Sequence, residues 1–258
     1  MKLKGSDIVS IFLVLLILAG LAAVCSLDGR ERSKMNCRAV KLSIDEPFRL
    51  IEDEQVMLRI REDYGECVGR KLDELDLSAI EKTLDGSGVV LKSQVWTTPD
   101  AVLHISLKQR TPVVRFLKDG GCFYSDRDGH LFKASRRCSL DLPVIDGDLP
   151  IEFGGELPTE DGAESEKKRW LMQTLDMLET MKGTPWEENV TQISVLPGGD
   201  MVMVPREGTE LFLFGRPDGA ADKFERMGKY YTHILPAKGE GYYRKVSVKY
   251  KGQIICTK

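Results

Sequence analysis

An uncharged apolar run near the N-terminus constrains the topology of this chain more than any other feature. The run extends from Ile8 to Cys25, reads IVSIFLVLLILAGLAAVC and holds a single hydroxyl side chain, that of Ser10. A helix of this length rises about 27 Å, which matches the hydrocarbon core of a thin bilayer. The run predicts a transmembrane helix over residues 8–25, between a short cytoplasmic tail at 1–7 and a linker at 26–36.

Flanking charges predict the orientation of this helix. Lys2 and Lys4 precede it, and basic residues favour the cytoplasmic side of a span. The bulk of the chain, after Asp28, is then expected outside the cytoplasm. Two alternatives stay open, because cleaved signal peptides and lipoproteins also begin with an apolar run. The stretch that ends at Cys25 resembles a lipoprotein processing site, although Val24 is bulky where a small residue is expected.

Charge and cysteine usage narrow the function classes. The 258 residues carry a formal net charge of -3 at pH 7, so no basic field indicates nucleic-acid binding. No C-x-x-C pair or metal-ligand spacing occurs among the cysteines that follow the apolar run. These are Cys37, Cys67, Cys122, Cys138 and Cys256. A Cys122–Cys138 disulfide and buried free thiols both fit the sequence.

Residues 37–112 predict a small module with the element order β-α-α-β-β. Val40, Leu42 and Ile44 alternate with polar residues, as in a half-buried strand. Two helices are expected next, over 52–63 and over 72–84, the second with Asp76 as its cap. Two strands follow, around 89–95 and 103–107, joined by a Thr98-Pro99-Asp100 turn.

Residues 113–258 predict a second, strand-rich domain with flanking helices. The expected helices span 166–181 and 220–235, and the expected strands cover 122–124, 131–132, 143–145, 191–196, 201–205 and 211–214. The chain closes with GYYRKVSVKYKGQIICTK, in which apolar and polar residues alternate from Lys245 onward. This period of two predicts one long, half-buried terminal strand with Val246, Val248 and Tyr250 on its inward face.

No catalytic constellation is evident. The three histidines, His104, His130 and His233, have no acidic or thiol neighbour at ligand spacing. Asp126-Arg127-Asp128-Gly129 begins like a calcium loop but lacks the later oxygen ligands, so a tight turn is expected. We therefore expect a protein that is not an enzyme, with no catalytic, cofactor-binding or metal-binding residues, and that works by binding.

Four stretches, in chain order, carry a resemblance to a known family. They are LDELDLSAIEKTLDGSGVVLKSQVW (Leu72–Trp96), LHISLKQRTPVVRF (Leu103–Phe116), CFYSDRDGHLF (Cys122–Phe132) and VSVKYKGQ (Val246–Gln253). Together, behind an N-terminal anchor, they resemble the FtsQ/DivIB bacterial cell-division proteins. KFERMGKYYTHILP followed by YYRKVSVKYKGQIICTK resembles the shorter Bacteroidota-type members. The resemblance implies an α+β fold class: a transmembrane helix, a POTRA-like module at 37–112 and a mixed β domain at 113–258.

The resemblance also implies a function and a site. It implies a single-pass scaffold of the inner membrane, with its bulk in the periplasm at the division septum, that helps control septal peptidoglycan synthesis. Expected partners are the small coiled-coil proteins FtsB and FtsL, with septal synthase components as further candidates. The family's partner adds a strand to the sheet edge at the last strand. Carried over to this sequence, the implied contacts are Lys245, Val246, Ser247, Val248, Lys249 and Tyr250, with the preceding Tyr242 and Tyr243 as candidate flanking anchors.

Departures from the family pattern favour backbone pairing over side-chain contacts at this site. Ser247 and Lys249 stand where the family usually has an acidic residue and an arginine. Two other functions are less consistent with the sequence. A POTRA-bearing assembly or secretion receptor usually has tandem modules or a membrane barrel, and an anchored cell-wall hydrolase needs a catalytic dyad or metal cluster.

Overall fold

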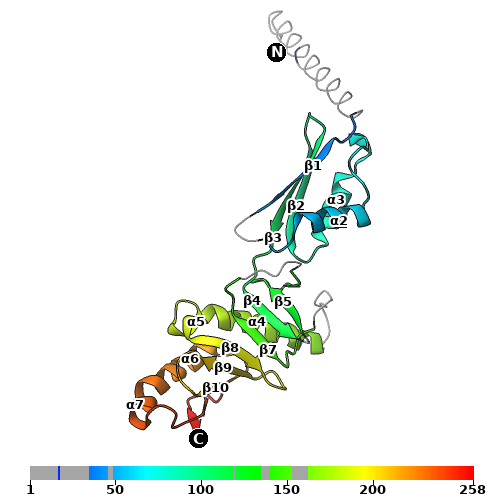
Figure 1. Cartoon of the computed structure of the whole chain (residues 1–258). Helices are drawn as coiled ribbons and strands as arrows, with labels where there is room; N and C mark the ends of the chain where they lie inside the picture. The colour runs from blue at the N-terminus through cyan, green and yellow to red at the C-terminus, as the bar shows by residue number, and fades with distance from the viewer. Residues whose placement is uncertain (1–16, 18–34, 46–48, 119, 135–139, 153–161) are drawn as a thin grey trace, which may run out of the picture. The chain divides into compact units, whose positions relative to one another are not determined.

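The structure is a computed structural model that describes residues 17, 35–45, 49–118, 120–134, 140–152 and 162–258. The chain divides into two compact units, the first up to Gln109 and the second from Arg110. Each unit has its own sheet (Figure 1). The domain bounds expected from the sequence, 37–112 and 113–258, stay predictions.

Within the described residues, no helix is long and apolar enough to cross a membrane. The span expected at 8–25 lies outside those residues, except for Ile17, so it stays a prediction.

The first unit has the predicted β-α-α-β-β order. Its elements are β1 (Ala39–Ile44), α2 (Asp53–Asp63), the 3₁₀ turn η1 (Leu72–Glu74), α3 (Leu77–Asp85), β2 (Val90–Thr97) and β3 (Val102–Gln109). The sheet order is β1-β3-β2, with β1 parallel and β2 antiparallel to the central β3. Both helices lie against the sheet in Figure 1.

Alternation along β3 explains the core of this unit. Leu103, Ile105 and Leu107 are all buried, and the helices bury Ile60 and Ile80 among other residues. The prediction of one continuous helix over 72–84 is wrong in one respect, because the segment is split into η1 and α3. The Asp76 carboxylate accepts a hydrogen bond from the Ala79 backbone N–H at 3.0 Å, so it caps a new helix rather than continuing the first turn.

The second unit contains a nine-stranded mixed sheet. Its strands are β4 (Val114–Lys118), β5 (Gly121–Ser125), β6 (Leu131–Phe132), β7 (Val144–Gly147), β8 (Val190–Val195), β9 (Met201–Pro205), β10 (Leu211–Gly215), β11 (Lys245–Ser247) and β12 (Ile255–Thr257). They are ordered β12-β11-β10-β9-β8-β7-β4-β5-β6. Strand β7 runs parallel to both of its neighbours, β4 and β8, and β10 runs parallel to β11.

Helices supply the rest of the second core. They are α4 (Gly162–Met181), α5 (Pro185–Asn189), α6 (Ala220–Lys229), a π-helical turn η2 (Tyr230–Ile234) and α7 (Leu235–Lys238). One apolar cluster joins them to alternate residues of the strands. Phe212 and Phe214 of β10 belong to it, as do Trp170 of α4, Trp186 of α5 and Phe224 of α6. The sequence missed α5, which is a single short turn capped by Thr184.

The prediction of one long terminal strand is wrong. Strand β11 is three residues long, the chain then reverses, and β12 pairs with β11 in antiparallel register. Gln253 N–H bonds to the Tyr250 carbonyl at 3.2 Å, and Gly252 has φ +69°. A left-handed residue at this point suits glycine, so Lys251-Gly252 marks a turn that the alternating pattern conceals.

Within the described part of the chain, Cys37, Cys67, Cys122 and Cys256 form no disulfide with one another. Cys37 and Cys67 are buried. The disulfide considered between Cys122 and Cys138 remains untested, because Cys138 lies outside the described residues.

Candidate partner-binding surface

The expected contact strand is an interior strand of the sheet. On one side, Lys245, Val246 and Ser247 of β11 pair in parallel with Leu211, Phe212 and Leu213 of β10. On the other side, they pair with Thr257, Cys256 and Ile255 of β12. At this end of the sheet, the outer edge therefore belongs to β12, not to β11.

The expected site residues differ in exposure. Val246 and Val248 are fully buried, so only their backbone groups could serve a partner. The prediction that Tyr250 faces inward is wrong, because this residue is 53% exposed. It lies in the segment that turns between β11 and β12, where the strand period no longer applies. Lys245 and Lys249 are exposed, and Ser247 is half-buried.

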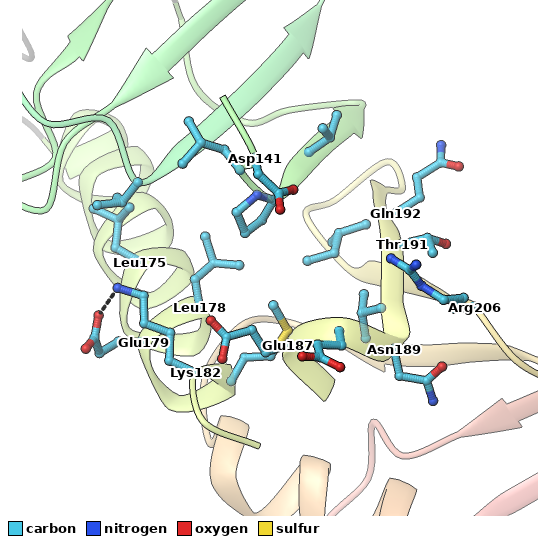
Figure 2. Close-up of a pocket in the computed structure, with 18 of the residues that line it drawn as sticks. Asp141, Leu175, Leu178, Glu179, Lys182, Glu187, Asn189, Thr191, Gln192 and Arg206 are labelled. Carbon is cyan, nitrogen blue, oxygen red and sulfur yellow. Dashed lines mark hydrogen bonds and ion pairs between the residues drawn. The ribbon is translucent and has the colours of Figure 1, made fainter. Parts of the chain in front are cut away.

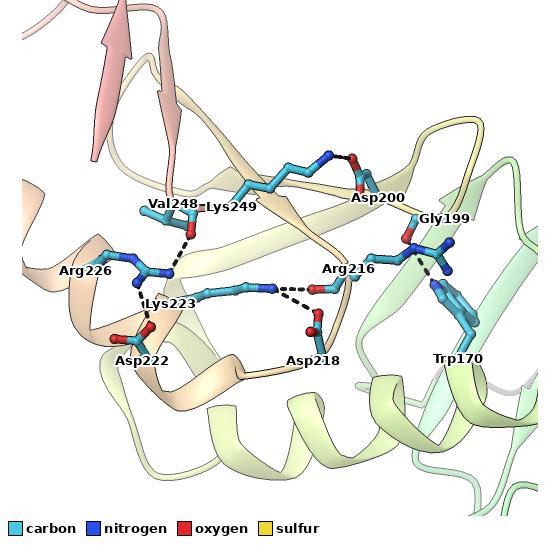
Figure 3. A network of polar contacts seen from close by, with 10 residues as sticks. All are labelled: Trp170, Gly199, Asp200, Arg216, Asp218, Asp222, Lys223, Arg226, Val248 and Lys249. Carbon is cyan, nitrogen blue, oxygen red and sulfur yellow. Dashed lines mark hydrogen bonds and ion pairs between the residues drawn. The ribbon is translucent and has the colours of Figure 1, made fainter. Parts of the chain in front are cut away.

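Hydrogen bonds at Val248 fix the direction of the chain beyond β11. The Val248 N–H donates to the Leu213 carbonyl at 3.0 Å, which continues the pairing with β10 by one residue. The Val248 carbonyl accepts a bond from Arg226 Nη2 at 2.7 Å (Figure 3). Arg226 also bonds Asp222 at 2.6 Å and is only 4% exposed. Helix α6 thus holds the start of the terminal turn through a buried guanidinium.

Lys249 adds a second tie to the same segment. Its ammonium pairs with the Asp200 carboxylate (Figure 3), which raises the pKa of Lys249 through a hydrogen bond and through charge attraction. Its stem lies over Gly215 so closely that a Cβ there would meet Lys249 Cγ at 2.7 Å. The close packing explains why β10 ends in glycine.

Lys223 is the other buried cation of α6. Its Nζ donates to the Arg216 carbonyl at 2.6 Å and lies 3.3 Å from Asp218. It also lies 5.1 Å from the centroid of the Phe214 ring. Burial lowers the pKa of Lys223, partly offset by Asp218. Sequence reasoning missed both Lys223 and Arg226, because their acceptors are backbone carbonyls that no motif marks.

An aromatic and cationic cluster flanks the free edge. The rings of Tyr242 and Tyr243 form an edge-to-face pair with centroids 4.8 Å apart. The ammonium of Lys258 lies 4.4 Å from the centroid of Tyr242, and that of Lys238 lies 5.8 Å away. A hydrogen bond to Lys258 lowers the pKa of Tyr242. Tyr242 is exposed, as is Ile255 of β12, so the edge carries apolar contact area of the kind that interfaces use.

The Asp126 segment forms a tight turn. Asp126 Oδ1 accepts bonds from the N–H groups of Asp128 and His130 at 3.1 and 2.8 Å. Its Oδ2 pairs with Arg110 at 2.8 Å. Both oxygens are thus engaged by protein groups. Across the described ranges, no group of three or more His, Cys, Asp or Glu residues could hold a metal ion.

A comparison with known families matches the second unit. A family model described as FtsQ/DivIB, C-terminal related, covers residues 111–257, which is more than half of the chain. The matched range includes β11, β12, Arg226 and the two tyrosines. No curated protein matches the chain.

Proposed function

The chain belongs to the FtsQ/DivIB, C-terminal related family, and from this premise we propose that it is a non-enzymatic scaffold of the bacterial division machinery. It holds small single-span coiled-coil partners of the FtsB and FtsL type and so helps control septal peptidoglycan synthesis. The apolar run at 8–25 anchors it once in the inner membrane, with both described units in the periplasm at the septum.

A partner strand adds to the outer edge of β12. An edge strand presents unpaired backbone N–H and C=O groups, which another chain can use to extend the sheet. This edge carries the proposal, because β11 already has a neighbour on each side. From its place beside β12, the partner also contacts three of the residues that the family resemblance implies. These are Tyr242, Lys245 and Tyr250, whose side chains are exposed.

The ties at Val248 and Lys249 support this assignment. A strand added to a frayed hairpin must first order that hairpin, which weakens binding. Arg226 and Asp200 hold the residues that enter the turn, so the edge is preorganised. A Val248→Pro variant could not separate partner binding from folding, because it would remove the hydrogen bond from the Val248 N–H to the Leu213 carbonyl.

The test is a disulfide across the hairpin. Val246 lies opposite Cys256, and directly opposite residues of antiparallel strands have Cα atoms about 4.5–5.5 Å apart, within reach of a disulfide. Oxidised glutathione should therefore close a bond in the V246C variant. If a partner adds to β12, an FtsB-type partner binds the oxidised and reduced variant equally.

Loss of partner binding on oxidation would show that β12 must be displaced to expose β11, and would reject the β12 edge. The V246C/C256S variant is the matched control, because it carries the same core change and cannot close the bond. Photo-crosslinking from Ile255 and Thr257 in dividing cells gives a second measurement. Absence of any partner crosslink from both positions, together with crosslinks from elsewhere, would contradict the proposal.

A further inference from the structure

A groove lies in the second unit near the other part of the sheet, at the amino ends of the parallel strands β4, β7 and β8 (Figure 2). Its volume is about 1010 Å³. Much of the lining comes from residues 111–113 before β4, 141–144 at the start of β7, 189–193 at the start of β8, and from α4 and α5; Arg127, Lys182, Arg206 and Glu207 complete it. We call it the α4–β8 groove. It shares no residue with the β12 edge.

The floor of the groove is apolar. Leu175, Leu178 and Met181 of α4 form its inner wall and are almost fully buried. Val144 and Val190, at the starts of β7 and β8, are half-buried and face the same space. The apolar surface that an incoming side chain could cover is therefore that of the half-buried valines, while the α4 residues back it from within.

One side of the rim is neutralised within the protein. Glu179 pairs with Lys182 at 3.0 Å, as Figure 2 shows, and with Arg127 at 3.4 Å. Arg127 also donates to the Leu175 carbonyl at 3.0 Å and lies 3.6 Å from Asp176. The charges of these four side chains cancel.

The rest of the rim is acidic. It carries four exposed carboxylates and one exposed guanidinium, those of Asp141, Glu187, Glu188, Glu207 and Arg206. Glu187 accepts a bond from the Gly183 N–H at 2.7 Å. In the described part of the chain, no ion pair engages Asp141, Glu188 or Glu207. The rim thus presents an excess of negative charge around an apolar floor.

We propose that the α4–β8 groove binds a cationic amphipathic segment of another protein, with its apolar side chains on the floor and its lysines or arginines over the acidic rim. Charge complementarity selects this occupant. An acidic peptide or a nucleic acid would be repelled by the same carboxylates. A metal ion is disfavoured, because no group of carboxylates among the described residues converges closely enough to ligate one.

This inference is independent of strand addition at β12, because the two surfaces use different elements. A scaffold with both surfaces could hold two partners at once. Failure of one proposal leaves the other standing.

The experiment measures binding of defined probe peptides to the full chain in uncharged detergent micelles. The first probe is a labelled helical peptide of lysine and leucine; the second has glutamate in place of lysine, and the third has serine in place of leucine. Fluorescence anisotropy is read against micelles without protein. We expect binding of the first probe, weakened by added salt, and at least about tenfold weaker binding of the other two.

The decisive variant is D141K/E188K, since both side chains are exposed and lie on the rim. It should weaken the lysine–leucine probe about fivefold to tenfold, because each rim charge contributes modestly. The matched control is E62K/D73K, which changes the net charge equally at exposed residues of the first unit. The control should leave binding unchanged.

Three outcomes would overturn the proposal. They are no binding of the lysine–leucine probe, equal binding of the glutamate–leucine probe, and equal weakening by the rim variant and the control. Equal weakening would show a general field effect of the whole chain rather than a groove.

Discussion

Arg226 is the single residue on which the terminal hairpin most depends. It is buried on α6, and two of its nitrogens bond Val248 and Asp222. Among the described residues, its Nε finds no hydrogen-bond partner, so the site already carries part of the desolvation cost of a buried charge. The guanidinium nevertheless positions the Val248 carbonyl, just after β11.

Replacing Arg226 with alanine should destabilise the second unit by about 2–4 kcal/mol, because it leaves the Val248 carbonyl without its donor and opens a gap under the hairpin. Urea unfolding of the variant measures this. Lys229→Ala is the matched control on the same helix, since Lys229 pairs with Glu225 four residues earlier at an exposed position. It should cost less than about 0.5 kcal/mol. Equal effects of the two changes would contradict the role of Arg226.

Single residues also mark where the sequence misled. Tyr250 continues the alternating pattern, so periodicity placed it inward, whereas the turn ahead of Gly252 leaves it exposed. Periodicity measures which residues could share a face and does not register a chain reversal. Buried Lys223 and Arg226 could not be predicted, because their partners are carbonyls brought near only by the fold.

Among the elements, the pairing of β7 with β8 leaves the least space. Gly147 lies opposite Val195 with φ +94°, and a Cβ at Gly147 would lie 2.3 Å from the Val195 carbonyl oxygen. Backbone atoms cannot move aside as a flexible side chain can. Glycine is therefore required at the end of β7 for both conformation and space.

We expect Gly147→Ala to destabilise the second unit by more than about 3 kcal/mol, the sum of the left-handed backbone cost and the overlap with β8. Gly183→Ala is the matched comparison. Gly183 also has a positive φ, +68°, but no atom of the described residues lies within 4 Å of its Cβ position. It should cost only about 1 kcal/mol. Thermal unfolding followed by circular dichroism measures both, and similar losses would refute the steric account.

Most helices and strands were predictable, including short strands such as β9 (Met201–Pro205), but α5 and β12 were not. The β-α-α-β-β order of the first unit follows from periodicity and caps, as the Asp76 cap shows. Helix α5 has five residues and β12 has three. Such segments contain too few residues for a period to develop, so tertiary pairing decides their structure.

At the scale of the whole molecule, the chain consists of two compact units with separate sheets. Their cores contain different buried residues, among them Ile80 in the first unit and Met203 in the second. A separate core allows a unit to unfold by itself.

Calorimetry of the full chain should therefore show two thermal transitions. Ile80→Ala, which removes buried methylenes from the first core, should lower one transition, and Met203→Ala should lower the other, each by roughly 2–4 kcal/mol of stability. A single transition that both variants shift equally would show that the units unfold together.

The sequence supported the family and the fold class but not the strand order of the second sheet. The family match at 111–257 confirms the resemblance. The order β12-β11-β10-β9-β8-β7-β4-β5-β6 includes parallel neighbours joined by long connections, and periodicity carries no information on which strands become neighbours. The position of the free edge was therefore hidden until the fold was known.

The place of β12 in chain order has a consequence for biosynthesis. Every other described strand precedes it, and β11 reaches its place beside β10 only after α6 and α7 have crossed over. Since a ribosome delivers the N-terminal parts first, the outermost strand is added to a sheet that is otherwise complete. A nascent or prematurely terminated chain would end with β11 uncovered and without the edge strand. If a partner adds to β12, as proposed, it can bind only after residues 255–257 have been synthesised.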